Sequence, residues 1–214
     1  MSQKNNMAKN NPLATYIYDS ITAHKQEMIH KISKLHVMIA ARHIDIETFD
    51  KRKISIHGIE YSGTLIHIYW SYFDPFIKDY VARTAEEIRL KAIESCVNVN
   101  ACLNLFRKNM YDTITIIYTK IAETDRLMRG KGYPKKVALR SVDTEINFLC
   151  QYVDEKIDAQ IDIVKRQKRK KIKDFLLEHI NMIIFVFLII IGFLCEKMGW
   201  ISLGKFIEMI LTKI

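Results

Sequence analysis

The chain has 214 residues, with 33 Lys and Arg against 24 Asp and Glu, which gives a formal net charge of +9. Only seven Gly and three Pro occur, so the composition argues against a loop-rich protein and predicts a mostly helical one with a single soluble domain. The four Cys form no CxxC pair, and no nucleophile elbow, HExxH motif or glycine-rich nucleotide loop occurs. We therefore predict no enzyme, no cofactor and no metal site.

The first 11 residues are polar and predicted to be disordered, and Pro12 begins a helix that runs to about residue 42. Apolar residues recur along this helix at steps of three and four. The stripe consists of Ile17, Ile21, His24, Met28, Ile32, Leu35 and Ile39. Because His24 falls on this apolar face, we predict that it is a hydrogen-bonded core or interface residue.

Residues 44–73 allow two interpretations. Polar and apolar residues alternate over 53–70, with Gly58 and Gly63 among them, a pattern typical of a short β-hairpin. A helix from Ser62 onward is the alternative, with Ile66, Tyr69, Trp70 and Phe73 on one side. We favour the helix, because the surrounding segments are helical and an isolated hairpin is only marginally stable.

The rest of the soluble part is predicted to form two long helices. Asp74 and Pro75 start the first, which runs to Met128 with a kink near 98–100. Residues 129–134 end it, and Pro134 starts the second, which nothing ends before Gly192. Residues 12–164 are thus predicted to be an all-α, elongated bundle of long helices, and the narrow apolar stripes predict a homo-oligomer.

A dense basic segment lies at residues 165–173, where seven of nine residues are basic. They are Lys165, Arg166, Lys168, Arg169, Lys170, Lys171 and Lys173. An apolar run follows at 180–195, and its extension to 175–195 is predicted to be a transmembrane helix, with a buried core helix as the alternative. Because Lys-rich and Arg-rich flanks stay in the cytoplasm, we predict an inner-membrane protein with a cytoplasmic N-terminal domain and an external C-terminus. The basic residues would contact anionic lipid.

The last 19 residues, 196–214, have apolar and polar faces when placed on a helix. We predict an amphipathic helix on the far membrane surface, with Trp200 at the interface. In the alternative, the chain turns at Gly199 and re-enters the membrane, where Lys205 and Glu208 would face a pore.

A second basic cluster surrounds Gly130 and Gly132. It consists of Arg126, Arg129, Lys131, Lys135, Lys136 and Arg140. In a helix starting at Pro134, about 60 Å would separate this cluster from Lys173, which is beyond the reach of membrane electrostatics. We therefore predict an anionic ligand, a nucleotide or short oligonucleotide, with an ordinary solvated helix turn as the alternative.

A row of carboxylates, Asp154, Asp158 and Asp162, shares one helix face. The row is a candidate pore vestibule or divalent site, and the alternative is a solvated face paired with basic residues of a neighbouring helix. Glu178 and Asn181 are further pore candidates at the cytoplasmic entrance of the apolar segment.

In the order of its parts and the placement of its charges, the chain resembles small membrane effectors of bacterial anti-phage and abortive-infection systems. That resemblance implies a homo-oligomeric membrane effector or ion channel, gated by a nucleotide or nucleic-acid signal. The alternative is a passive tail-anchored adaptor or tether that binds a protein partner. The amphipathic tail distinguishes the two, because only a pore former should need it.

Overall fold

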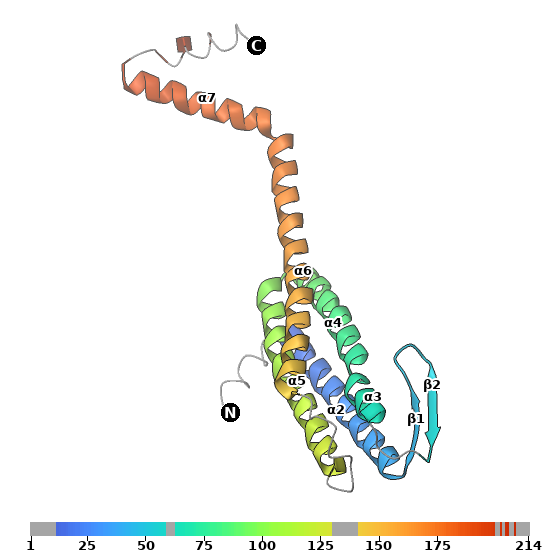
Figure 1. The fold of residues 1–214 in the computed structure, drawn as a ribbon. Helices are drawn as coiled ribbons and strands as arrows, with labels where there is room; N and C mark the ends of the chain where they lie inside the picture. Colours follow the sequence, from blue (N-terminus) through green and yellow to red (C-terminus); the bar gives the residue numbers. More distant parts are fainter. Residues whose placement is uncertain are drawn as a thin grey trace. The chain divides into compact units, whose positions relative to one another are not determined.

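The computed structural model describes residues 12–58, 63–129 and 141–199, together with Ser202, Gly204, Lys205 and Glu208 (Figure 1). The chain divides into two compact units, Met1–Asp162 and Ile163–Ile214. The described elements are α2 (Pro12–Ala40), β1 (His43–Glu47), β2 (Lys53–His57), α3 (Gly63–Ser71), α4 (Asp74–Glu94), α5 (Val99–Arg129), α6 (Val142–Glu178) and α7 (Ile180–Lys197). The predicted all-α class is confirmed, with one small hairpin added.

Helix α2 packs chiefly against α5 and also contacts α4 and β1. All seven residues of its predicted apolar stripe are buried, and the stripe is therefore confirmed. Within the described residues of the first unit, the core continues through α3, α4, α5 and the first half of α6, where Leu149, Val153 and Ile157 are buried. Burial of one apolar face of each helix, rather than intrinsic helix propensity, stabilises such a bundle.

The ambiguous segment contains both a hairpin and a helix. Strands β1 and β2 pair antiparallel, with Ile44 opposite Ile56 and Ile46 opposite Ile54. The hairpin predicted for 53–70 was therefore misplaced, because residues 53–57 supply only the second strand and the first strand precedes them. The helix predicted from Ser62 is confirmed from Gly63 onward as α3, and all four residues expected on its apolar side are buried.

The single helix predicted over 74–128 with a kink near 98–100 is wrong, because the chain forms two helices, α4 and α5, and the second begins at the place of the predicted kink. Helix α4 ends in a Schellman motif, in which the Cys96 N–H bonds to Ile93 O at 3.2 Å and the Val97 N–H bonds to Ala92 O at 2.9 Å. Cys96 takes a left-handed φ of 53°. Asn98 then caps α5, since its Oδ1 accepts the Ala101 N–H at 3.2 Å. The two helices pack against each other and run antiparallel (Figure 1).

The described part of α6 begins at Val142, where the Thr144 N–H donates to Ser141 Oγ at 3.3 Å. The predicted helix start at Pro134 lies outside the described residues. The predicted continuity to Gly192 is wrong, because the helix is interrupted at His179. There the backbone N–H and the ring Nδ1 both lie near Phe175 O, at 3.1 and 3.0 Å. A side chain that competes for a backbone carbonyl in this way weakens a helix locally.

Among the described residues, no single helix is both long and apolar enough to cross a membrane. Val142–Glu178 and Met182–Leu194 meet the requirement by length and composition only when taken together, as a pair bent by 66°. The segment predicted to span, 175–195, is thus divided between the end of α6 and α7. Apart from four isolated positions, the predicted amphipathic tail beyond Gly199 lies outside the described residues.

Candidate functional site

The second unit combines an exposed basic surface with an exposed apolar helix. All seven basic side chains of residues 165–173 are exposed on α6. Phe175, Leu176 and Leu177 follow them and are exposed as well. On α7 the exposed large apolar side chains are Ile180, Met182, Ile184, Phe185, Val186, Phe187, Ile189, Ile190, Ile191, Phe193 and Leu194. These positions cover every side of the helix, so no single neighbouring surface could bury them all.

For the pore candidates Glu178, Lys205 and Glu208, the structure gives the exposure of the side chain. Glu178 is exposed at the last position of α6. Lys205 and Glu208 are exposed at isolated described positions. The side chain of Asn181 lies outside the described part of the structure.

Two residues of the candidate ligand cluster are described, and they differ in environment. Arg126 is exposed, whereas Arg129 Nε lies 3.1 Å from Oδ2 of Asp125, whose side chain is 0% exposed. A buried carboxylate depends strongly on its basic partner, so Arg129 supports the end of α5. Lys131, Lys135, Lys136 and Arg140 lie outside the described residues.

Two carboxylates of the aspartate row contact α5. Arg107 forms ion pairs with both, at 3.3 Å from its Nε to Asp154 Oδ1 and through its Nη2 to Asp158. The Tyr111 hydroxyl also donates to Asp154. These contacts join the first half of α6 to α5. For Asp154 and Asp158 they match the alternative interpretation of the aspartate row, in which it pairs with basic residues of a neighbouring helix. Asp162 is exposed one turn further along.

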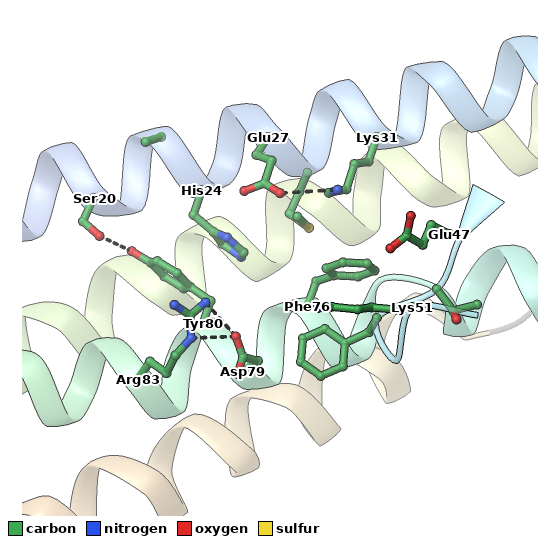
Figure 2. Close-up of a pocket in the computed structure, with 14 residues that line it drawn as sticks. Ser20, His24, Glu27, Lys31, Glu47, Lys51, Phe76, Asp79, Tyr80 and Arg83 are labelled. Atoms are coloured by element: carbon green, nitrogen blue, oxygen red, sulfur yellow. Dashed lines mark hydrogen bonds and ion pairs between the residues drawn. The ribbon is translucent and has the colours of Figure 1, made fainter. Parts of the chain in front are cut away.

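The first unit also contains a cleft that sequence patterns did not indicate. It has a volume of about 680 Å³ and lies between α2, the β1–β2 hairpin and α4 (Figure 2). Phe49 from the hairpin and Phe76 from α4 line it, with ring centroids 5.5 Å apart and the rings at 88°. The cleft arises because Phe49 packs against Phe76 and so holds the hairpin turn beside the helices.

Among the described residues that line this cleft, His24 is the buried polar one. Its ring stacks on Tyr80, with centroids 3.8 Å apart and an angle of 3° between the planes, and the Tyr80 hydroxyl lies 2.8 Å from Ser20 Oγ. The predicted burial of His24 is confirmed, at 6% exposed, but its Nε2 has no hydrogen-bond partner among the described residues. Burial lowers the pKa of the His24 imidazole from 6.5 to about 4, so the ring is neutral at pH 7.

Charged side chains of both signs surround the cleft in close pairs. Lys31 lies 3.4 Å from Glu27, and Arg83 lies 2.6 Å from Asp79 (Figure 2). Lys31 also lies 4.8 Å from the centre of the Phe76 ring. The paired residues are four apart on α2 and α4, a spacing visible in the sequence. What the sequence could not indicate is that the hairpin brings these two helix faces and Phe49 together.

Across residues 12–58, 63–129 and 141–199, no group of three or more His, Cys, Asp or Glu side chains lies close enough to hold a metal ion. Comparison with known proteins found no match for this chain among protein-family models, curated protein sequences or solved structures.

Proposed function

We propose that this protein is a homo-oligomeric membrane effector, in which α7 and the end of α6 insert into the cytoplasmic membrane and change its permeability. The proposal depends on one observation above all: α7 exposes large apolar side chains on every side and follows seven exposed basic residues. Each fully buried Ile, Leu or Phe contributes roughly 1.5–3 kcal/mol. For the exposed residues of α7, transfer into lipid is therefore favourable by on the order of 15 kcal/mol.

The basic residues determine which surface the segment approaches. Each Lys or Arg near an anionic leaflet contributes about 1 kcal/mol. Such residues are also retained on the cytoplasmic side during insertion, which places the first unit in the cytoplasm and the C-terminus outside. The apolar helix would thus provide most of the affinity, and residues 165–173 the orientation.

Ligand control is assigned to the basic cluster near the end of α5. Because Arg129 is engaged by the buried Asp125, we assign the ligand contacts to Arg126 and to Lys131, Lys135, Lys136 and Arg140. An anionic ligand, a nucleotide or short oligonucleotide, would neutralise these charges. Five-residue replacement by Gln should abolish a ligand response and leave membrane insertion intact.

The first test is membrane depolarisation in bacteria that express the full chain, followed with a voltage-sensitive dye. Phe187→Glu places a charge on the exposed surface of α7 and should abolish depolarisation and membrane fractionation. Val37→Glu is the matched control, because Val37 is an exposed apolar residue of α2 in the first unit. Equal depolarisation by both variants would contradict the assignment of α7.

Deletion after Lys197 separates an effector from a passive anchor. An effector that uses its tail to perturb the membrane should lose depolarisation while the protein stays in the membrane fraction. A tail-anchored adaptor should tolerate the deletion, and a full chain that leaves membranes polarised at good expression would favour the adaptor.

A further inference from the structure

We propose that the cleft between α2, the β1–β2 hairpin and α4 binds a small, uncharged heteroaromatic molecule of the nucleobase or nucleoside class, with His24 Nε2 hydrogen-bonded to the edge of its ring. This inference concerns the first unit alone and does not depend on membrane attachment.

The size and lining of the cleft suit a ligand with a planar ring. Its volume of about 680 Å³ lies within the usual range of small-molecule sites, roughly 300–1,000 Å³. Phe49, Phe76 and Tyr80 provide aromatic surface, and Met28 adds apolar surface from α2. Aromatic side chains attract planar rings by stacking and edge contacts in addition to apolar burial. Three rings from two different parts of the fold therefore favour an aromatic ligand over an aliphatic one.

His24 provides the specific polar contact. Figure 2 shows its side chain projecting from α2 toward α4, and it is 94% buried, with no hydrogen-bond partner for Nε2 in the part of the chain that the structure describes. A buried polar atom without a partner is costly, and native proteins satisfy nearly all such atoms with protein, water or ligand. A neutral imidazole can donate or accept at Nε2, depending on its tautomer. Heterocycles that carry donors and acceptors on one edge suit either case.

The charges around the cleft favour a ligand without net charge. Three basic residues, Lys31, Lys51 and Arg83, line it together with three acidic ones, Glu27, Glu47 and Asp79. Lys31 and Arg83 are already paired with carboxylates. A phosphate would have to displace these carboxylates or rely on Lys51 in a lining that also contains Glu47. Each ion pair instead presents a donor and an acceptor side by side, which matches the amino and carbonyl groups of a base.

The test is saturation-transfer NMR on the full chain in detergent micelles, with adenosine, guanosine, cytidine and uridine as probes. At least one nucleoside should receive transfer at its base protons. His24→Phe keeps a stacking ring but removes Nε2, and should weaken binding of that nucleoside about five-fold, as expected for one hydrogen bond. His30→Phe is the matched control, since His30 is exposed on the same helix outside the cleft, and should leave affinity unchanged.

A second pair of variants protects the test against misfolding of the His24 variant. Phe49→Ala shortens an aromatic wall at a partly exposed position and should also weaken binding, whereas Val37→Ala, at an exposed apolar position of α2 outside the cleft, should not. Absence of transfer to all four nucleosides would overturn the proposal and leave ordered water as the partner of Nε2. Equal effects of the cleft and control variants would overturn it, as would competition by inorganic phosphate or tighter binding of adenosine 5′-monophosphate than of adenosine.

Discussion

Acidification should destabilise the first unit through His24. Burial holds the pKa of this imidazole at about 4 in the folded protein, against 6.5 for an exposed histidine. As the pH falls below 6.5, the unfolded chain binds a proton that the folded chain refuses, so the free energy of unfolding decreases. The loss is complete only below about pH 4, where both states are protonated. A shift of this size corresponds to about 3 kcal/mol in total, most of it lost between pH 6.5 and about pH 4.5.

His24→Phe provides the comparison that isolates this effect. Phenylalanine retains a ring next to Tyr80 and cannot be protonated, while Glu27, Lys31 and Arg83 nearby remain in both proteins. The stability difference between variant and wild type should therefore grow by about 2 kcal/mol in favour of the variant between pH 7 and about pH 4.5. Contributions from other titrating groups cancel in this comparison.

Urea unfolding of both proteins in detergent micelles, followed by far-UV circular dichroism at the two pH values, measures the difference. NMR titration of the His24 ring gives its pKa directly. A stability difference that does not change with pH, together with a His24 pKa near 6.5, would refute the argument. It would mean that the imidazole is hydrated and that the cleft is more open than the 6% exposed fraction of His24 indicates.

Three further outcomes test other parts of the structure. Arg129→Ala should lower the free energy of unfolding by about 3 kcal/mol, because it removes an ion-pair partner of the buried Asp125. Arg126→Ala at an exposed position should change it by less than about 0.5 kcal/mol in urea denaturation. Cys96→Gly should raise stability by about 1 kcal/mol, because Gly adopts a positive φ without strain, and a lower melting temperature would contradict this. Replacing the four basic residues at 168–171 by Gln should weaken flotation with phosphatidylglycerol vesicles by about 4 kcal/mol, or roughly a thousand-fold, and equal flotation at low salt would contradict an electrostatic role.

Amphipathic spacing predicted the helices well, but it did not predict where they end. The stripe of α2 could be identified residue by residue because burial of one helix face requires apolar residues at steps of three and four. The boundary between α4 and α5 was predicted only as a kink near 98–100, because apolar spacing continues through it. The Schellman motif there places Cys96, rather than the usual Gly, at the left-handed position, so the sequence contains no conventional stop signal.

The candidate sites differ in how much local sequence could indicate. Charge density alone identified residues 165–173, because their exposure follows from seven basic residues in nine. The cleft could not be predicted, since it requires Phe49 to reach Phe76 from a hairpin whose first strand was not recognised. Arg129 was grouped with the ligand-binding residues because basic residues cluster around it in the sequence. Its ion pair with Asp125 could have been predicted from a helix over these residues, because side chains four positions apart are neighbours on a helix.

The interruption at His179 bears on how the proposed membrane segment would act. With 18 residues, α7 is about 27 Å long, slightly less than the roughly 30 Å of hydrocarbon in a bilayer. Glu178 and His179 are polar and lie at the junction, so we expect them at the headgroups rather than within the lipid. An apolar helix that is too short is accommodated by local thinning of the bilayer or by association of several copies. Both responses perturb a membrane, whereas a passive anchor gains nothing from either. The proposed effector role therefore predicts that removing the interruption, by His179→Leu, should improve membrane anchoring and reduce depolarisation. A variant that loses membrane anchoring together with depolarisation would contradict this and show that His179 is needed for insertion itself.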